Sequence, residues 1–230
     1  MKKLVVFTGA GISQESGINT FRDSGGLWEE YKIADVCSPE AWKKDPKLVL
    51  EFYNKRRKQA LEAMPNRAHE IIAELEKNFE VQIITQNIDD LHERAGSTNV
   101  LHLHGEITKA RSVGTEKVQT IGNKPIFLND LCNSGFQLRP HIVWFGEDVP
   151  NMLIAEDIVK TADIFLIIGS SLNVYPAAGL VYQAPEDCPK YLVDPSANIE
   201  TQSIINLTVI NEKATTGLAI VASILRKEYL

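Results

Sequence analysis

Histidines and short polar sequences in this chain are of the kinds that carry acid–base chemistry. There are five histidines, and an imidazole can accept a proton near neutral pH because its ordinary pKa lies close to that pH. His104 directly precedes Gly105, and His102 lies two residues earlier. If both histidines lie on one strand, their side chains point in opposite directions. A single histidine considered alone is more often structural than catalytic.

A second polar group follows an apolar segment and consists of Gln86, Asn87 and Asp89. An amide side chain can hold a sugar hydroxyl or a water molecule, and a carboxylate beside the backbone of Ile88 can hold a carboxamide. Asparagine and aspartate after a strand are also ordinary turn formers. Both interpretations stay open on these residues alone.

The first apolar segment ends in Thr8-Gly9-Ala10-Gly11-Ile12-Ser13. The two glycines allow a sharp turn and a close approach of the backbone to a ligand. A helix that begins there would direct free N–H groups at a pyrophosphate. The full dinucleotide fingerprint needs a third glycine, and Gly17 comes two residues too late for it. An ordinary strand-to-helix turn remains the alternative.

Short, nearly all-apolar segments must position these groups, and each ends at a polar residue or a glycine. Such segments are typical of parallel strands that are covered on both faces, and ligands bind at the carboxyl ends of those strands. Helices are expected between them, with Asp45 and Asn66 as capping residues. The expected strands are 4–7, 81–84, 142–145, 164–168 and 191–193, and the expected helices are 46–64, 68–78, 150–161 and 215–227.

This alternation predicts an α/β fold with a Rossmann-like, doubly wound parallel sheet and a small inserted subdomain. The expected core comprises about 1–30, 80–108 and 139–230, and a small helical insertion covers about 31–79. Residues 109–138 are rich in Lys, Ser, Thr, Gly and Asn and are expected to form a second insertion.

Length, charge and composition argue against several classes of protein. The 230 residues suit one domain with an insertion, and the net charge of −6 argues against a broad basic face for nucleic acid. The apolar stretch near the N-terminus is too short for a signal peptide, and none approaches the roughly 20 residues that span a bilayer. The three cysteines, Cys37, Cys132 and Cys188, are far apart, which disfavours disulfides. A cytoplasmic protein without membrane contact, and a monomer, is expected.

Several motifs together resemble the sirtuin (Sir2) family of NAD-dependent protein deacylases, in the family's order and over nearly the whole chain. Several motifs at compatible spacing are far more specific than one. They are Gly9-Ala10-Gly11-Ile12-Ser13, Glu15-Ser16-Gly17-Ile18, Thr20-Phe21-Arg22-Asp23, Gly25-Gly26-Leu27-Trp28, Thr85-Gln86-Asn87-Ile88-Asp89-Asp90-Leu91-His92, His102-Leu103-His104-Gly105, Arg139-Pro140-His141-Ile142-Val143-Trp144-Phe145-Gly146-Glu147 and Gly169-Ser170-Ser171-Leu172-Asn173-Val174-Tyr175-Pro176.

The resemblance implies a role for each motif. His104 would be the catalytic base, with Asn87 as a second catalytic residue. An acyl-lysine protein or peptide would bind as an added strand between two segments, one formed by Val143, Trp144, Phe145, Gly146 and Glu147 and the other containing Val174. The residues implied in binding NAD are Gly9, Ala10, Gly11, Phe21, Arg22, Asp23, Gln86, Asn87, Ile88, Asp89, Gly169, Ser170 and Ser171.

The implied reaction transfers the acyl group from lysine to ADP-ribose. The acyl oxygen attacks the nicotinamide ribose, nicotinamide leaves, and His104 removes a proton from a ribose hydroxyl. That hydroxyl attacks the bound imidate, and water then releases free lysine and O-acyl-ADP-ribose. An NAD glycohydrolase or mono-ADP-ribosyltransferase, and a non-catalytic NAD or ADP-ribose binding module, are the alternatives. A generic dehydrogenase is disfavoured by the glycine spacing.

Two departures from the family pattern concern zinc binding and adenosine binding. Most sirtuins hold a structural zinc with two Cys-x-x-Cys pairs, whereas Ser112 and Thr115 stand at the first pair and only Cys132 lies near the second. No zinc is therefore expected. Asp194-Pro195 replaces the family's usual asparagine, which puts one adenosine contact in doubt.

Tyr53 and Arg56 match the Tyr-x-x-Arg motif of the sirtuin class that removes succinyl, malonyl and glutaryl groups. At this spacing both side chains lie on one helix face, where they could bind a distal carboxylate. The alternative is a core tyrosine beside a solvated arginine. Cys37 stands where this class usually has alanine and is expected to leave a wide acyl pocket.

Overall fold

The structure is a computed structural model that describes residues 1–19, 31–172, 174–197 and 204–230. A sheet of six parallel strands lies at the centre of its larger lobe, in the order β3-β2-β1-β7-β8-β9. The strands are β1 (Lys3–Thr8), β2 (Glu80–Thr85), β3 (Val100–His102), β7 (Ile164–Ile168), β8 (Lys190–Val193) and β9 (Leu207–Ile210).

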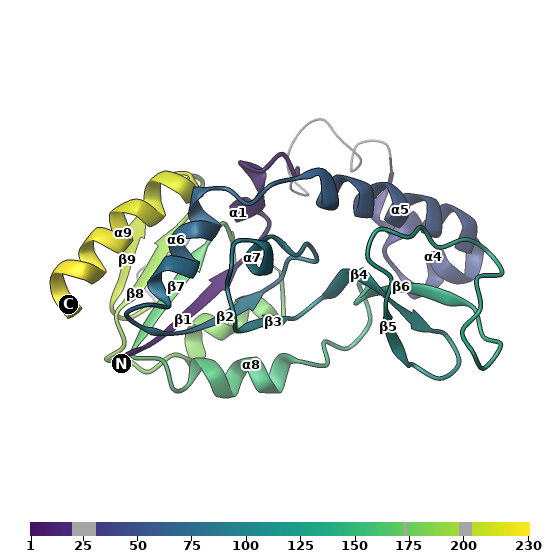
Figure 1. The fold of residues 1–230 in the computed structure, drawn as a ribbon. Coiled ribbons are helices and arrows are strands. Elements are labelled where there is room, and N and C mark those ends of the chain that lie inside the picture. The colour runs from purple at the N-terminus through teal and green to yellow at the C-terminus, as the bar shows by residue number, and fades with distance from the viewer. Residues whose placement is uncertain (20–30, 173, 198–203) are drawn as a thin grey trace.

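Helices cover both faces of this sheet. Figure 1 shows α6 and α9 on one side of it and α8 on the other. Side chains of β1 alternate between the two resulting cores: Leu4 and Val6 pack with α6 and α9, and Val5 and Phe7 with α8 and η1. The helices of this lobe are α1 (Gly11–Gln14), α6 (Arg67–Leu75), α7 (Leu91–Arg94), α8 (Met152–Val159), the 3₁₀ helix η1 (Ala177–Gln183) and α9 (Ala214–Tyr229).

A smaller lobe lies at the end of the molecule remote from α9 (Figure 1). It contains an antiparallel sheet of three strands in the order β5-β4-β6. Its elements are α3 (Ile33–Val36), α4 (Pro39–Lys44), α5 (Pro46–Glu62), β4 (Gly105–Ser112), β5 (Val118–Thr120) and β6 (Leu138–Ile142).

The expected helix caps are confirmed. Asp45 accepts a hydrogen bond from the N–H of Leu48 at 3.0 Å, and Pro46 occupies the first turn of α5. Asn66 accepts one from the N–H of Ala68 at 2.9 Å, at the start of α6. These bonds satisfy N–H groups that a helix start would otherwise leave without a partner.

The predicted α/β fold with a doubly wound parallel sheet is confirmed, and four predicted strands lie within β1, β2, β7 and β8. The strand predicted at 142–145 is wrong, because β6 ends at Ile142 and pairs antiparallel with β4. The carboxylate of Glu147 accepts the N–H of Trp144 at 2.8 Å. This side-chain bond takes a donor that a continuing strand would use.

The expected boundaries of the insertions also need correction. Helix α6 falls within the predicted helical insertion 31–79, but its residues Ala68, Ile71 and Leu75 pack in the core with α9. A connection between the parallel strands β1 and β2 must cross a face of their sheet, so its helix covers that face. Conversely, 105–108 and 139–142, expected in the core, belong to the small sheet.

The second insertion, 109–138, is joined to α5 by packing and by hydrogen bonds. Leu50 of α5 packs with Ala110, Ile126 and Leu138. Asn54 forms two bonds with the backbone of Ile126: its Nδ2 donates to the carbonyl at 2.8 Å and its Oδ1 accepts from the N–H at 2.9 Å. Side-chain packing thus connects this insertion to the rest of the lobe.

A hydroxyl group organises the turn at the end of β4. Oγ of Ser112 accepts from the N–H groups of Gly114 at 3.3 Å and Thr115 at 3.2 Å, and Sγ of Cys132 donates to it at 3.4 Å. Ser112 is fully buried. The serine therefore joins two loops of the insertion. It stands where the family resemblance places the first pair of zinc-binding cysteines.

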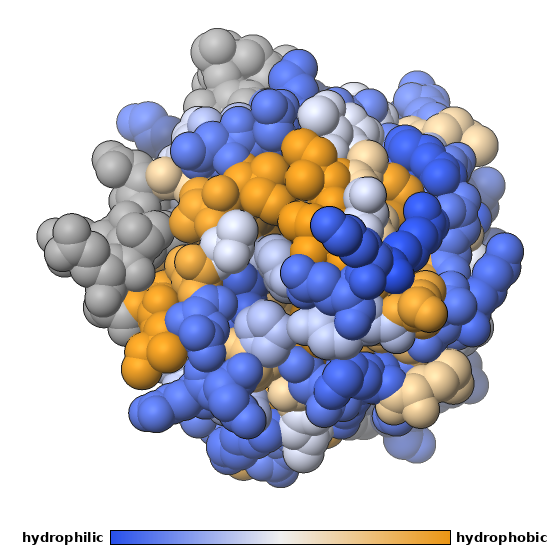
Figure 2. All heavy atoms as spheres, turned by 90° about the vertical axis from the view of Figure 1, so that its left-hand side faces the viewer, coloured by the Kyte–Doolittle hydropathy of each residue, from blue (hydrophilic) through white to orange (hydrophobic). Residues whose placement is uncertain are grey.

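The surface opposite the small lobe is mixed. Figure 2 shows the face on which α9 runs, with hydrophobic residues lying among more numerous hydrophilic ones. Ile220 of α9 is among the exposed apolar side chains. None of the helices in the described part of the chain has the length and apolar character needed to cross a bilayer.

Replacing Ser112 by alanine should lower the free energy of unfolding by about 1 kcal/mol, because two partly buried N–H groups lose their acceptor. Urea unfolding monitored by circular dichroism measures the change. The control is Ser134→Ala, an exposed serine of the same insertion, which should change stability by less than about 0.5 kcal/mol. Equal effects of the two substitutions would show that the Ser112 hydroxyl does not organise the turn.

Candidate active site

The site lies at the carboxyl ends of β1 and β7, where the order of strands changes direction. The chain adds β2 and β3 on one side of β1, and β7, β8 and β9 on the other. Loops that leave two such neighbouring strands diverge to opposite faces of the sheet, which opens a crevice between them. The fold itself thus selects this edge of the sheet for ligand binding.

Glycines allow the two loops at this edge to touch. The N–H of Gly9 donates to Ile168 at 3.0 Å, and that of Gly11 donates to Gly169 at 2.9 Å. A Cβ atom on Gly11 would lie 2.6 Å from the Cα of Gly169, which no side chain tolerates. Gly169 has a φ of +59°, in the left-handed region that favours glycine. The backbone therefore forms a floor without side chains, which suits a diphosphate.

Polar side chains from β1–α1 and from the loop after β2 form one network. Nδ2 of Asn87 donates to Oγ of Ser13 at 3.1 Å, and that hydroxyl donates to Oδ2 of Asp89 at 3.1 Å. Burial raises the pKa of Asp89, against the opposing effects of hydrogen bonds from the N–H of Leu91 and from Ser13. The network fixes the Asn87 amide and the Asp89 carboxylate beside the glycine floor.

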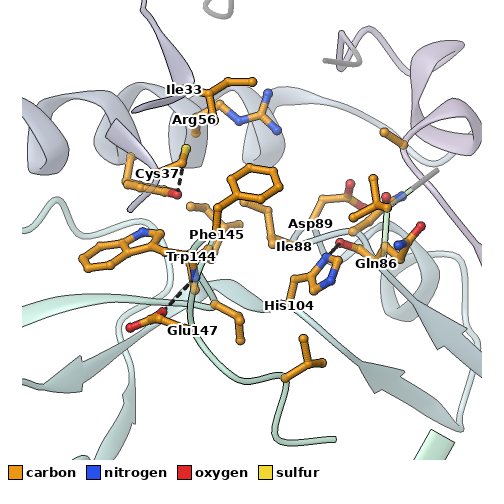
Figure 3. Close-up of a pocket in the computed structure, with 18 of the residues that line it drawn as sticks. Ile33, Cys37, Arg56, Gln86, Ile88, Asp89, His104, Trp144, Phe145 and Glu147 are labelled. Atoms are coloured by element: carbon orange, nitrogen blue, oxygen red, sulfur yellow. Dashed lines mark hydrogen bonds between the residues drawn. The ribbon is translucent and has the colours of Figure 1, made fainter. Parts of the chain in front are cut away.

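His104 presents a free proton acceptor to the same space. Its Nδ1 lies 3.0 Å from the carbonyl oxygen of Gln86. A carbonyl only accepts, so Nδ1 carries the hydrogen and Nε2 keeps a lone pair in the neutral ring. Burial lowers the pKa of His104, partly offset by the bond to Gln86. Figure 3 shows the ring beside Gln86, Ile88 and Asp89.

His102 and His104 are not on one strand, because β3 (Val100–His102) ends at His102, yet their rings still have different surroundings. Its ring contacts the carbonyl of Asn87 and the carboxylate of Glu93, and it is buried. His104, not His102, lines the cavity. The two histidines thus flank one loop, and only one of them can meet a ligand directly.

The segment after β6 closes the other side of the cavity and is attached at its backbone. The N–H of Val143 donates to the carbonyl of His104, and that of Phe145 to the carbonyl of Cys37, both at 3.0 Å. The segment therefore links the loop that carries His104 with the helical part of the small lobe.

Trp144 is held by a stacked arginine. The guanidinium carbon of Arg139 lies 3.3 Å from the centroid of the indole ring. Both oxygens of Glu147 accept from Arg139, at 2.7 and 2.9 Å, and one also accepts from Arg111 at 2.9 Å. The carboxylate of Glu147, predicted to bind substrate, is therefore engaged in holding this loop.

The acyl-pocket residues predicted from the sequence lie together. Oη of Tyr53 donates to Sγ of Cys37 at 3.3 Å. Burial raises the pKa of the Cys37 thiol to about 11, against smaller opposing effects of Tyr53 and Arg56, so the thiol is protonated at neutral pH. Arg56 lines the cavity, and burial lowers its pKa while Tyr53 and Asp89 favour its charged form. Figure 3 shows Cys37 and Arg56 above Phe145.

One cavity of about 390 Å³ joins these groups, which is within the usual size of small-molecule sites. The floor glycines Gly9, Gly11 and Gly169, with Ser170 and Ser171, lie next to its lining rather than in it. Phe21, Arg22 and Asp23 lie outside the described residues. The predicted residues that line it are Ala10, Cys37, Tyr53, Arg56, Gln86, Asn87, Ile88, Asp89, His104, Val143, Trp144, Phe145, Gly146, Glu147 and Val174.

Two further hydrogen bonds involve residues that the sequence analysis named. Oγ of Ser170 donates to Oε1 of Gln86 at 3.4 Å, which connects the end of β7 with the loop after β2. Asp194 follows β8, and its carboxylate accepts the N–H of Ser196 at 2.8 Å. The side chain that departs from the family pattern thus caps a turn of its own chain.

Sequence reasoning did not assign roles to Ser13 and Arg139. Ser13 lies inside the recognised glycine motif, and its position directly after the turn was a usable signal. Arg139 begins a recognised motif, but its stacking on Trp144 joins β6 to a loop and is decided only by packing.

Comparison with known proteins shows which family this chain resembles. The family model described as "Sir2 family" matches residues 9–176. An NAD-dependent protein deacylase of Bacteroides thetaiotaomicron is 51% identical over 226 residues, covering 95% of each chain. One from Helicobacter pylori is 52% identical over 218 residues, covering 95% of this chain and 93% of its own.

Solved structures of Sir2 homologues have a fold similar to that of this chain. A mutant Sir2 homologue in complex with ADP-ribose has a TM-score of 0.89 at 37% identity, covering 98% of this chain and 92% of its own. A Sir2 homologue in complex with NAD has a TM-score of 0.88 at 37% identity, covering 98% and 90%. With the matching family model and these relatives, the glycine floor, the Asn87–Asp89 network and His104 have a common explanation: this chain belongs to the Sir2 family.

Proposed function

We propose that this protein is an NAD-dependent protein-lysine deacylase that releases nicotinamide and O-acyl-ADP-ribose. The observation that carries the proposal is the free Nε2 lone pair of His104, in one cavity with Asn87 and Asp89. The relatives of known name are NAD-dependent protein deacylases, and similar structures hold NAD or ADP-ribose.

The residues present fit NAD. The floor made by Gly9, Gly11 and Gly169 is the kind of space that a Cβ would fill and a diphosphate can use. In this proposal Gly9, Ala10 and Gly11 bind the diphosphate, and the family resemblance assigns Phe21, Arg22 and Asp23, which lie outside the described residues, to NAD binding as well. Bound NAD supplies the electrophilic ribose carbon and receives the acyl group. The adenosine ribose is assigned to Gly169, Ser170 and Ser171, and the nicotinamide ribose and carboxamide to Gln86, Asn87, Ile88 and Asp89.

His104 is the proposed general base. Gln86 holds the hydrogen at Nδ1, so the proton to be removed goes to Nε2. Burial lowers the pKa of His104, which keeps the ring neutral, and therefore able to accept, at physiological pH. The amide of Asn87 is fixed by Ser13 and is proposed to orient a hydroxyl or water beside it.

The proposed substrates are acyl-lysine proteins or peptides. Residues 143–147 and Val174 line the same cavity, and in the proposal an extended peptide adds a strand between them. This recognition uses backbone groups and gives only modest sequence preference. In the proposal the enzyme is a cytoplasmic monomer that requires neither nucleic acid nor a membrane.

The acyl pocket supports a wider range than acetyl groups. The phenol of Tyr53 and the guanidinium of Arg56 both reach the cavity from α5. Arg56 offers hydrogen-bond donors and a positive charge to a carboxylate at the far end of a succinyl or malonyl group, and Tyr53 adds a donor when its O–H turns from Cys37 to that carboxylate. We therefore propose desuccinylase and demalonylase activity in addition to deacetylase activity.

Replacing His104 by alanine should reduce peptide deacylation by at least about 10²-fold, the usual contribution of a general base, while NAD binding stays within a few-fold. Turnover measured by mass spectrometry and NAD titration by calorimetry give the two values. The control is His141→Ala, a half-buried histidine outside the cavity, which should keep near-normal turnover. Retained deacylation in the His104 variant would remove this residue from its role.

Replacing Arg56 by methionine should lower kcat/KM for a succinyl-lysine peptide by about 10- to 150-fold, equivalent to ~1.5–3 kcal/mol for a lost hydrogen bond to a charged group. Deacetylation should change by less than about threefold, because an acetyl group has no distal carboxylate. Side-by-side kinetics of the two peptides provide the comparison.

The matched control is Lys55→Met, which removes a positive charge one residue away. Lys55 donates to Oη of Tyr31 at 2.8 Å on an exposed surface and does not line the cavity. This variant should leave both activities near normal. Equal losses of both activities in the Arg56 variant would contradict carboxylate recognition without touching the proposed deacylase activity.

A further inference from the structure

His102 is the last residue of β3 and lies behind the loop that carries Asn87 and Asp89. Only 8% of the residue is exposed, and its ring is outside the cavity that His104 lines. The deacylase mechanism proposed above makes no use of it. A buried histidine in contact with an active-site loop nevertheless has a protonation state that affects that loop.

Both ring nitrogens of His102 face groups that can only accept hydrogen bonds. Nδ1 lies 2.9 Å from the carbonyl oxygen of Asn87, and Nε2 lies 2.9 Å from Oε1 of Glu93. A neutral imidazole has one donor and one acceptor nitrogen, so it would turn a lone pair toward one of these oxygens. Only the protonated ring donates to both, and the geometry is therefore that of an imidazolium ion.

The surrounding charges favour this state. Burial opposes a charge on His102, but the hydrogen bond and charge of Glu93, the Asn87 carbonyl and the charge of Glu106 together raise its pKa. Lys109 forms an ion pair with Glu106 and faces Glu93 as well. The charged form of Asp89 is in turn favoured by the charge of His102.

The neighbouring histidine His92 is neutral, which leaves His102 as the charged member of the pair. Oγ1 of Thr8 donates to Thr85 at 2.8 Å, so Nε2 of His92 donates to Thr8 at 3.0 Å. Burial, together with the charges of His69 and His102, holds the pKa of His92 well below its usual value.

We propose that His102 is a positioning residue that acts as an imidazolium: Glu93 anchors its Nε2, its Nδ1 holds the carbonyl of Asn87, and the active-site loop is thereby kept in place. This inference rests on the proposed roles of Asn87 and Asp89. His102 holds the backbone carbonyl of Asn87, and Ser13 holds the side-chain amide of the same residue. Loss of a proton leaves one N–H for these two acceptors, so one of the two bonds is lost together with the positive charge near Asp89.

Two histidines of one loop then have opposite requirements. His104 must be neutral, so activity falls as the pH drops through its lowered pKa. His102 must be charged, and because its pKa is raised, the charge persists at neutral pH and is lost as the pH rises through that value. The kcat profile should therefore have an acid limb from His104 and an alkaline limb from His102.

Replacing Glu93 by glutamine keeps the size of the side chain and removes the negative charge. We expect the alkaline limb of kcat to move to lower pH by about one unit or more, since an opposite charge in contact contributes shifts of this size. The acid limb should stay in place. Glu70→Gln is the control, since this exposed glutamate pairs with Arg67; it should leave both limbs unchanged.

A measurement without turnover separates this inference from the proposed reaction. In the unmodified free enzyme, the nitrogen NMR signals of the His102 ring, assigned by comparison with His102→Gln, should show both nitrogens protonated at pH 7. A ring that is neutral at pH 7 would overturn the inference even if deacylation is confirmed. An unmoved alkaline limb in a folded Glu93→Gln protein would overturn it as well, whereas absent deacylation with a protonated ring would contradict only the proposed function.

Discussion

The contact between the turn after β1 and the end of β7 is the constraint on which the site depends. Gly11 donates to the carbonyl of Gly169, and a Cβ on either residue would collide with backbone of the other loop. These two strands lie side by side because the sheet grows outward from β1 in both directions. The strand order brings the loops together, and the absence of two side chains lets them touch.

The loop after β2 depends on this contact in turn. Ser13, one turn beyond the glycines, holds both the Asn87 amide and the Asp89 carboxylate, and Ser170 reaches Gln86 from the end of β7. Three segments that are far apart in sequence thus determine one arrangement of polar groups. Two histidines then flank the same loop, and Nδ1 of each ring lies at hydrogen-bond distance from a backbone carbonyl of that loop. Burial lowers the pKa of His104 despite its bond to Gln86, whereas Glu93 and the Asn87 carbonyl raise the pKa of His102 despite its burial.

The small lobe reaches the same cavity by a different set of interactions. Its sheet and α5 are joined through Asn54 and the Leu50 cluster, and the turn at Ser112 is closed by hydrogen bonds. This lobe supplies Tyr53, Arg56 and Cys37 to the lining of the cavity. Its loop at Trp144, held by Arg139 and Glu147, closes the side where an added strand would lie. In the proposed function, substrate recognition therefore comes largely from the small lobe and cofactor binding from the large one.

The amino-acid sequence by itself determined the fold class, the four strands β1, β2, β7 and β8, the caps at Asp45 and Asn66, and the family motifs. These are local properties, because apolar runs, capping residues and glycine turns act through neighbours in the chain. The strand predicted at 142–145 is wrong, because the carboxylate of Glu147 takes the N–H of Trp144. The assignment of α6 to an insertion is also wrong, because the crossover between β1 and β2 packs this helix on the central sheet. Only the tertiary structure decided that Ser13, Arg139 and His102 support the site. Their partners are distant in sequence, and a hydrogen bond between distant residues depends on the positions of whole elements rather than on residue type.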